Sequence, residues 1–125
     1  MKVYKILLFV NIALILMLSF SQLSFFIEYR LYRYDIYFHS IMYFFLIILV
    51  LQTISSKKDI KHTILWILTL ILLPILTEYV QQYLPYRRAD LIDISYDYLG
   101  MLFGIILFTI FKYVKTNKYQ EFSNH

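Results

Sequence analysis

One stretch of this chain decides its fold. Residues 78–104 read EYVQQYLPYRRADLIDISYDYLGMLFG and stand between two strongly apolar runs, residues 63–77 and residues 105–111. The polar middle of the stretch, residues 85–93, therefore reads as a short loop that joins two hydrophobic helices. Ionisable residues lie on this loop and on the helix ends that face it. Because a charged group inside an apolar membrane span is costly, such residues usually have a function.

The composition of the whole chain indicates a membrane protein. Of the 125 residues, 61% are hydrophobic and 20% are aromatic, and only two are glycine and two are proline. A water-soluble domain of this composition would expose large apolar patches to water. The length suits a single domain, residues 1–125. There is no cysteine, which excludes disulfides and thiol chemistry.

Four apolar segments are long enough to cross a bilayer as α-helices, which need about 20 residues each. The expected spans are residues 6–27, 36–54, 63–84 and 94–111. The first apolar run resembles a signal peptide, but no cleavage site of small residues follows it, so we expect an uncleaved span. We expect the basic tail, residues 112–125, to be frayed. The predicted fold class is all-α, a four-helix transmembrane bundle.

The positive charges predict how the bundle is oriented. The N-terminus, the second loop and the tail carry eight lysines, whereas the first and third loops carry four arginines accompanied by four acids. The positive-inside rule therefore places both termini in the cytoplasm. We expect a multi-pass protein of the cell membrane. Because the charges cluster in short segments between apolar spans, the net charge of +4 does not indicate a nucleic-acid partner.

This orientation brings polar groups from four helix ends to the outer membrane face. Glu78 lies about 9 Å inside the end of the third span, by the rise of a helix. Asp35 and His39 are four residues apart and share one face at the start of the second span. His39 could act as a general base, a metal ligand or a hydrogen-bonded structural group. Asp35, His39 and Glu78 are the candidate catalytic residues.

A stripe of residues runs along the fourth span. Asp93, Asp97, Gly100 and Gly104 follow one another at spacings of four, three and four, which places them on one helix face. The two glycines form a G-x-x-x-G pattern, which allows another helix to approach closely, and we assign them to helix packing. The aspartates need partners near lipid, and Arg87 and Arg88 are the obvious ones, because arginine forms bidentate pairs with carboxylates. We expect these groups to form one outward-facing cup.

The same residues resemble the VanZ-like family of small membrane proteins. The family pattern is an E-x-x-Q at the end of one span, a Pro-x-Arg loop, an Asp that begins the next span, and glycines beyond it. The matching positions here are Glu78, Gln81, Pro85, Arg87, Asp90, Asp93, Asp97, Gly100 and Gly104. Asp97 stands where the family usually has Asn, which adds an acid to the site. Asp35 and His39 resemble the family's Asp-x-x-x-His. The resemblance implies a link to resistance against glycopeptide antibiotics of the teicoplanin type.

Three functions fit this pattern. The first is binding of a lipid-linked cell-envelope molecule or an amphiphilic glycopeptide antibiotic, with polar headgroup atoms held by six residues: Glu78, Gln81, Arg87, Asp90, Asp93 and Asp97. The second is an enzyme that acts on a lipid headgroup or cell-wall precursor by general acid/base chemistry. The third is a structural cluster that locks the helices together. No dense metal-binding motif occurs, so we expect no metal and no cofactor.

Overall fold

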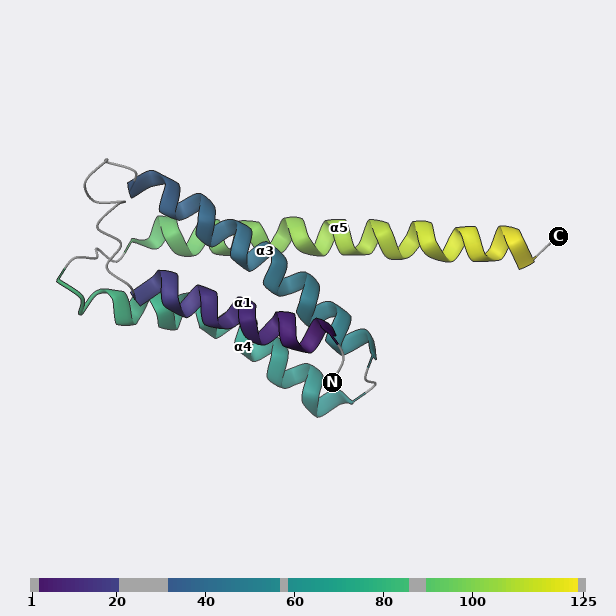
Figure 1. Cartoon of the computed structure of the whole chain (residues 1–125), viewed down its shortest axis with the longest axis horizontal. Coiled ribbons are helices and arrows are strands. Elements are labelled where there is room, and N and C mark those ends of the chain that lie inside the picture. The colour runs from purple at the N-terminus through teal and green to yellow at the C-terminus, as the bar shows by residue number, and fades with distance from the viewer. Residues whose placement is uncertain (1–2, 21–31, 57–58, 86–89, 124–125) are drawn as a thin grey trace.

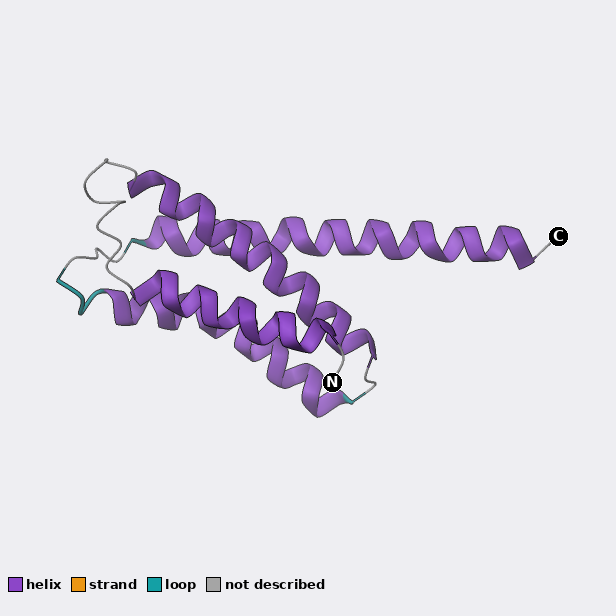
Figure 2. Cartoon of the chain, viewed as in Figure 1, coloured by secondary structure: helices purple, strands orange, loops and turns teal. Residues whose placement is uncertain are grey.

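The computed structural model describes residues 3–20, 32–56, 59–85 and 90–123, apart from the side chains of residues 32–35. These residues form four α-helices, and no strand occurs among them (Figures 1 and 2). The helices are α1 (Val3–Phe20), α3 (Tyr32–Ser56), α4 (Ile60–Gln81) and α5 (Leu91–Ser123). Each helix is long and apolar enough to cross a membrane, which confirms the all-α prediction with four membrane-length helices.

The helix bounds differ from the expected spans mainly at the chain ends. Helix α1 already begins at Val3, and residues 21–27 of the expected first span lie outside the described residues. The prediction of a frayed tail is wrong, because α5 continues without interruption to Ser123. Nothing in residues 112–123 breaks a helix: the segment has no glycine or proline and contains the good helix formers Lys, Gln and Glu.

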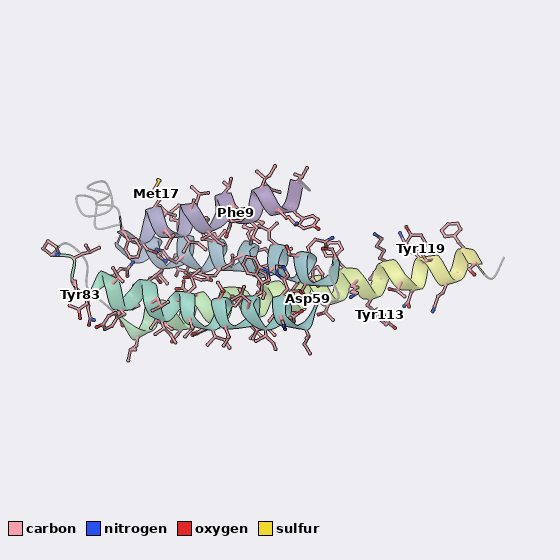
Figure 3. The ribbon with its side chains drawn as sticks, turned by 90° about the horizontal axis from the view of Figure 1, so that it is seen from below. Phe9, Met17, Asp59, Tyr83, Tyr113 and Tyr119 are labelled. Atoms are coloured by element: carbon pink, nitrogen blue, oxygen red, sulfur yellow. The ribbon has the colours of Figure 1, made fainter. Side chains whose placement is uncertain are left out.

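Helix α5 is therefore much longer than a bilayer requires. Its 33 residues span about 50 Å at the α-helical rise, compared with a hydrocarbon core of about 30 Å. The C-terminal part of α5 extends beyond the other three helices (Figures 1 and 3). We call this part, residues 112–123, the α5 extension.

Helix α3 packs most closely against α5 and α1, while α4 makes sparser contacts with each of the other three helices. The buried core is built from apolar side chains of all four helices: Leu8, Ile15, Tyr43, Leu46, Ile47, Val50, Leu70 and Met101. The outward faces are also apolar, and Phe9 and Met17 of α1 point away from the bundle (Figure 3). Large exposed apolar faces on every helix are the surface of a protein whose solvent is lipid.

Helices α3 and α5 approach each other closely at the two glycines, both of which are buried. A Cβ atom added to Gly100 would collide with the backbone carbonyl of Ser40 in α3. A Cβ atom added to Gly104 would collide with the side chain of Ile47 and lie 2.9 Å from the carbonyl oxygen of Phe44. The absence of side chains at these two positions lets the two backbones touch, which is how small residues join membrane helices.

Both termini lie toward the same end of the bundle (Figure 1). We expect that end to face the cytoplasm, and because the chain has no cysteine, single cysteines can report this cleanly. Lys61 and Tyr83 are exposed near opposite ends of α4. A membrane-impermeant maleimide should label Tyr83→Cys in intact cells, and Lys61→Cys only after permeabilisation. Lys118→Cys serves as a second inner-side control. Labelling of Lys61→Cys and Tyr83→Cys from the same side would contradict this topology.

Candidate functional site

Three ionisable side chains on three different helices are buried toward one end of the bundle. His39 of α3 is 8% exposed, Glu78 of α4 is 7% exposed and Asp97 of α5 is 2% exposed. Each lies within about two turns of the end at which α3 and α5 begin and α4 ends. We call these three residues, together with Tyr43, the polar cluster.

His39 and Asp97 face each other across the closest helix pair. Their Nδ1 and Oδ1 atoms are 3.9 Å apart, which places an acid beside the imidazole ring. The local sequence explains this geometry. The backbone carbonyl of Ser40 packs directly against Gly100. Ser40 follows His39 in the sequence, and Gly100 lies one turn after Asp97. The close backbone contact at Gly100 therefore brings these two side chains together.

Tyr43 is the member of the cluster that sequence reasoning missed. Its side chain is completely buried. The carboxylates of Asp97 and Glu78 are both near enough to interact electrostatically with its phenol group. A signal was present in the sequence, since Tyr43 follows His39 by four residues and so shares its helix face.

Glu78 fixes the junction between α4 and α5. One of its carboxylate oxygens accepts a hydrogen bond from the backbone N–H of Asp90. Asp90 in turn caps α5: its carboxylate accepts the backbone N–H of Ile92 at 3.0 Å, and its carbonyl accepts the N–H of Asp93 at 3.0 Å. A carboxylate at this position satisfies donors that a helix start leaves unpaired. The carboxylate of Asp90 thus has a local structural task in addition to the predicted binding role.

Gln81 joins α4 to α1. Its side-chain nitrogen donates a hydrogen bond of 2.9 Å to the backbone carbonyl of Ser19, and both residues are buried. Ser19 is in the last turn of α1, where carbonyl groups lack partners within the helix. Gln81, which was predicted to bind a ligand, therefore links two helices by donating to a carbonyl group that lacks a partner within its own helix.

A second hydrogen bond joins α4 to α5, about two turns of α4 away from Glu78. The hydroxyl group of Tyr98 donates to the backbone carbonyl of Ile71 at 2.6 Å. Tyr98 directly follows Asp97, so this bond fixes the rotation of α5 that turns Asp97 toward α3. The orientation of the cluster is thus set by contacts on both sides of α5.

The remaining predicted site residues are less fully described. Arg87 lies outside the described residues, and Asp35 belongs to α3 but its side chain is not described. Asp93 is partly buried in the first turn of α5, on the same face as Asp97. Within the described ranges, no three His, Asp or Glu side chains are grouped so that they could hold a metal ion.

No protein-family model, no curated protein and no solved structure matches this chain. The similarity to the VanZ-like pattern therefore rests on the residues named above, and the function has to be inferred from the polar cluster itself.

Proposed function

We propose that this chain is a multi-pass protein of the cell membrane that binds the polar headgroup of an amphiphilic cell-envelope molecule at the polar cluster. The observation that carries the proposal is the burial of His39, Glu78 and Asp97 within membrane-length helices. Burying ionisable groups costs free energy, and apolar residues of similar volume could pack the helices without that cost. Such groups inside a span are typical of a functional site.

The burial pattern also suggests how a ligand would engage the site. Asp90 and Asp93 are only partly buried and form the accessible rim, while Glu78 and Asp97 lie beneath them. Carboxylates accept hydrogen bonds from hydroxyl, amide and ammonium groups, which are abundant in the headgroups of envelope precursors. The apolar outer faces of the helices would then accommodate the lipid tail.

Two kinds of ligand share this chemistry. A lipid-linked envelope precursor and a lipid-tailed glycopeptide antibiotic both join a donor-rich polar head to an apolar chain. Membership of the VanZ-like family, which we propose from the residues Glu78, Gln81, Asp90, Asp93 and Gly100 among others, favours ligands of this kind. The test below distinguishes the two, because only the first would be retained from the host membrane.

An enzymatic function is the second candidate, and the pairing of His39 with Asp97 favours it. A carboxylate close to an imidazole ring orients the ring and stabilises its protonated form, which suits a general base. Glu78 would then be a second acid/base group on the facing helix. In this case the substrate would be the lipid headgroup itself, and it would be chemically changed.

The proposal can be tested by identifying lipids that stay bound to the protein. We expect the purified wild type to retain one class of membrane lipid, and Asp93→Asn to retain about tenfold less, because a hydrogen bond to a charged group contributes about 1.5–3 kcal/mol. Bound lipids are extracted and weighed by mass spectrometry. Glu121→Gln removes the same charge from the α5 extension and should retain the wild-type amount.

Two outcomes decide between the candidates. If added lipid extract yields a product of changed mass in the presence of wild type but not Asp93→Asn, the chain is an enzyme. If wild type and Asp93→Asn retain the same lipids in the same amounts, the rim does not bind a headgroup and the proposal is wrong. For the antibiotic, teicoplanin added to lipid-stripped protein should bind to wild type and not to Asp93→Asn.

A further inference from the structure

A crevice of about 470 Å³ lies at the end of the bundle opposite the polar cluster. Its lining residues come from the last turns of α3 and from the stretch of α5 at the start of the α5 extension. Helix α3 contributes Gln52 and Ser55 and ends one residue later, while α5 contributes Phe108, Lys112 and Lys115. Because the lysines directly follow the apolar part of α5, the crevice lies at the boundary between hydrocarbon and headgroups.

The lining of the crevice changes from apolar to cationic along α5. Phe108 is one turn before Lys112 and on the same helix face, and Lys115 follows three residues later. Gln52 and Ser55 face the lysines from α3 and add neutral hydrogen-bonding groups. Further along α5, Thr116 and Tyr119 of the α5 extension also line the crevice, as does Phe111.

No carboxylate neutralises the two lysines within this lining. Of the acids described at this end, Asp59 caps α4 by accepting the N–H of Lys61 at 3.1 Å. Glu121 lies six residues after Lys115 and so projects from a different face of α5. The crevice therefore carries two positive charges next to an apolar wall, which is complementary to an anion that carries a hydrocarbon chain.

We propose that this crevice binds the phosphate group of an anionic phospholipid. Lys112 and Lys115 bind the phosphate, Gln52 and Ser55 bind the neighbouring headgroup or glycerol oxygens, and an acyl chain lies against Phe108. Basic crevices between membrane helices at the cytoplasmic face are sites of this kind, because anionic lipids are concentrated there. The site is separate from the polar cluster, and neither depends on the other.

The test uses the full-length protein in neutral detergent and native mass spectrometry. Phosphatidylglycerol and phosphatidylcholine with identical acyl chains are added in equal amounts, and the bound lipid is counted. We expect wild type to bind phosphatidylglycerol with about tenfold preference, since each lysine near a membrane surface contributes measurably to anionic lipid binding. The double substitution Lys112→Gln and Lys115→Gln should reduce the preference to nearly one.

The matched control is the double substitution Lys61→Gln and Lys118→Gln. It removes the same charge from exposed positions outside the crevice and should keep the wild-type preference. Thermal unfolding of both variants should match wild type, because all four lysines are exposed. Equal loss of preference in the control, or no preference in wild type, would overturn the proposal. So would displacement of phosphatidylglycerol by an equal concentration of glycerol phosphate, which would indicate a site for free phosphate instead.

Discussion

Gly100→Leu is expected to separate α5 from α3 and to destroy the native packing of the bundle. Even the first atom of a new side chain would collide with the backbone carbonyl of Ser40. A backbone atom cannot turn aside as a side chain can, so the helices have to move apart. Overpacking a core usually costs about 1–3 kcal/mol, and a backbone collision at the closest helix pair should cost at least the upper part of that range. Thermal unfolding in detergent measures the loss.

The matched control is Thr109→Leu, which adds the same side chain at an exposed position of α5. This variant should unfold at the wild-type temperature, because the added atoms extend into lipid or detergent. Gly104→Leu should fall between the two, because part of its collision is with the end of the Ile47 side chain, which can rotate. If Gly100→Leu and Thr109→Leu unfold at the same temperature, the close contact between α3 and α5 is not present in the protein.

Asp97→Leu is expected to destabilise the polar cluster, and His39 is expected to account for much of the loss. The substitution removes the acid that lies 3.9 Å from the buried imidazole ring of His39, and loss of such a buried polar contact costs about 1–3 kcal/mol. Asp97→Asn keeps an acceptor oxygen at the same place and should be tolerated better.

A double-mutant cycle separates the pairing of these residues from general packing effects. The variants Asp97→Leu, His39→Leu and the combination of both are compared by their free energies of unfolding. Residues in direct contact show interaction energies of about 0.5–3 kcal/mol, and we expect a value in this range for this pair, whose Nδ1 and Oδ1 atoms are 3.9 Å apart. Additive losses would mean that His39 and Asp97 act independently.

The sequence predicted the helices well because a membrane span has a simple requirement. About 20 consecutive apolar residues suffice, and four such segments are present. The burial of Gly100 and Asp97 could be anticipated because both break the apolar pattern and their spacing places them on one helix face. In the same way, His39 and Glu78 stood out as ionisable residues within apolar segments.

Contacts between helices were much harder to predict. In a membrane protein the lipid-facing and inward-facing surfaces are both apolar, so periodicity does not reveal which side of a helix is buried. For Tyr43 the residue type gives no indication of burial, and only its position four residues after His39 does. The hydrogen bond from Gln81 to Ser19 joins residues far apart in the sequence, and no local sequence pattern predicts it. The end of the apolar run at Phe111 does not mark the end of α5, because a polar segment without helix breakers continues the helix to Ser123.

The central claim is that the polar cluster serves ligand binding and does not merely hold the helices together. Glu78→Gln tests this claim most directly, because glutamine keeps an oxygen that can accept the N–H of Asp90 while removing the negative charge. Ligand retention and thermal unfolding are measured on the same preparation. We predict that lipid retention falls at least about tenfold, as expected for loss of a hydrogen bond to a charged group, while the unfolding temperature stays near wild type. Unchanged lipid retention with a lowered unfolding temperature would contradict the account and identify the cluster as structural.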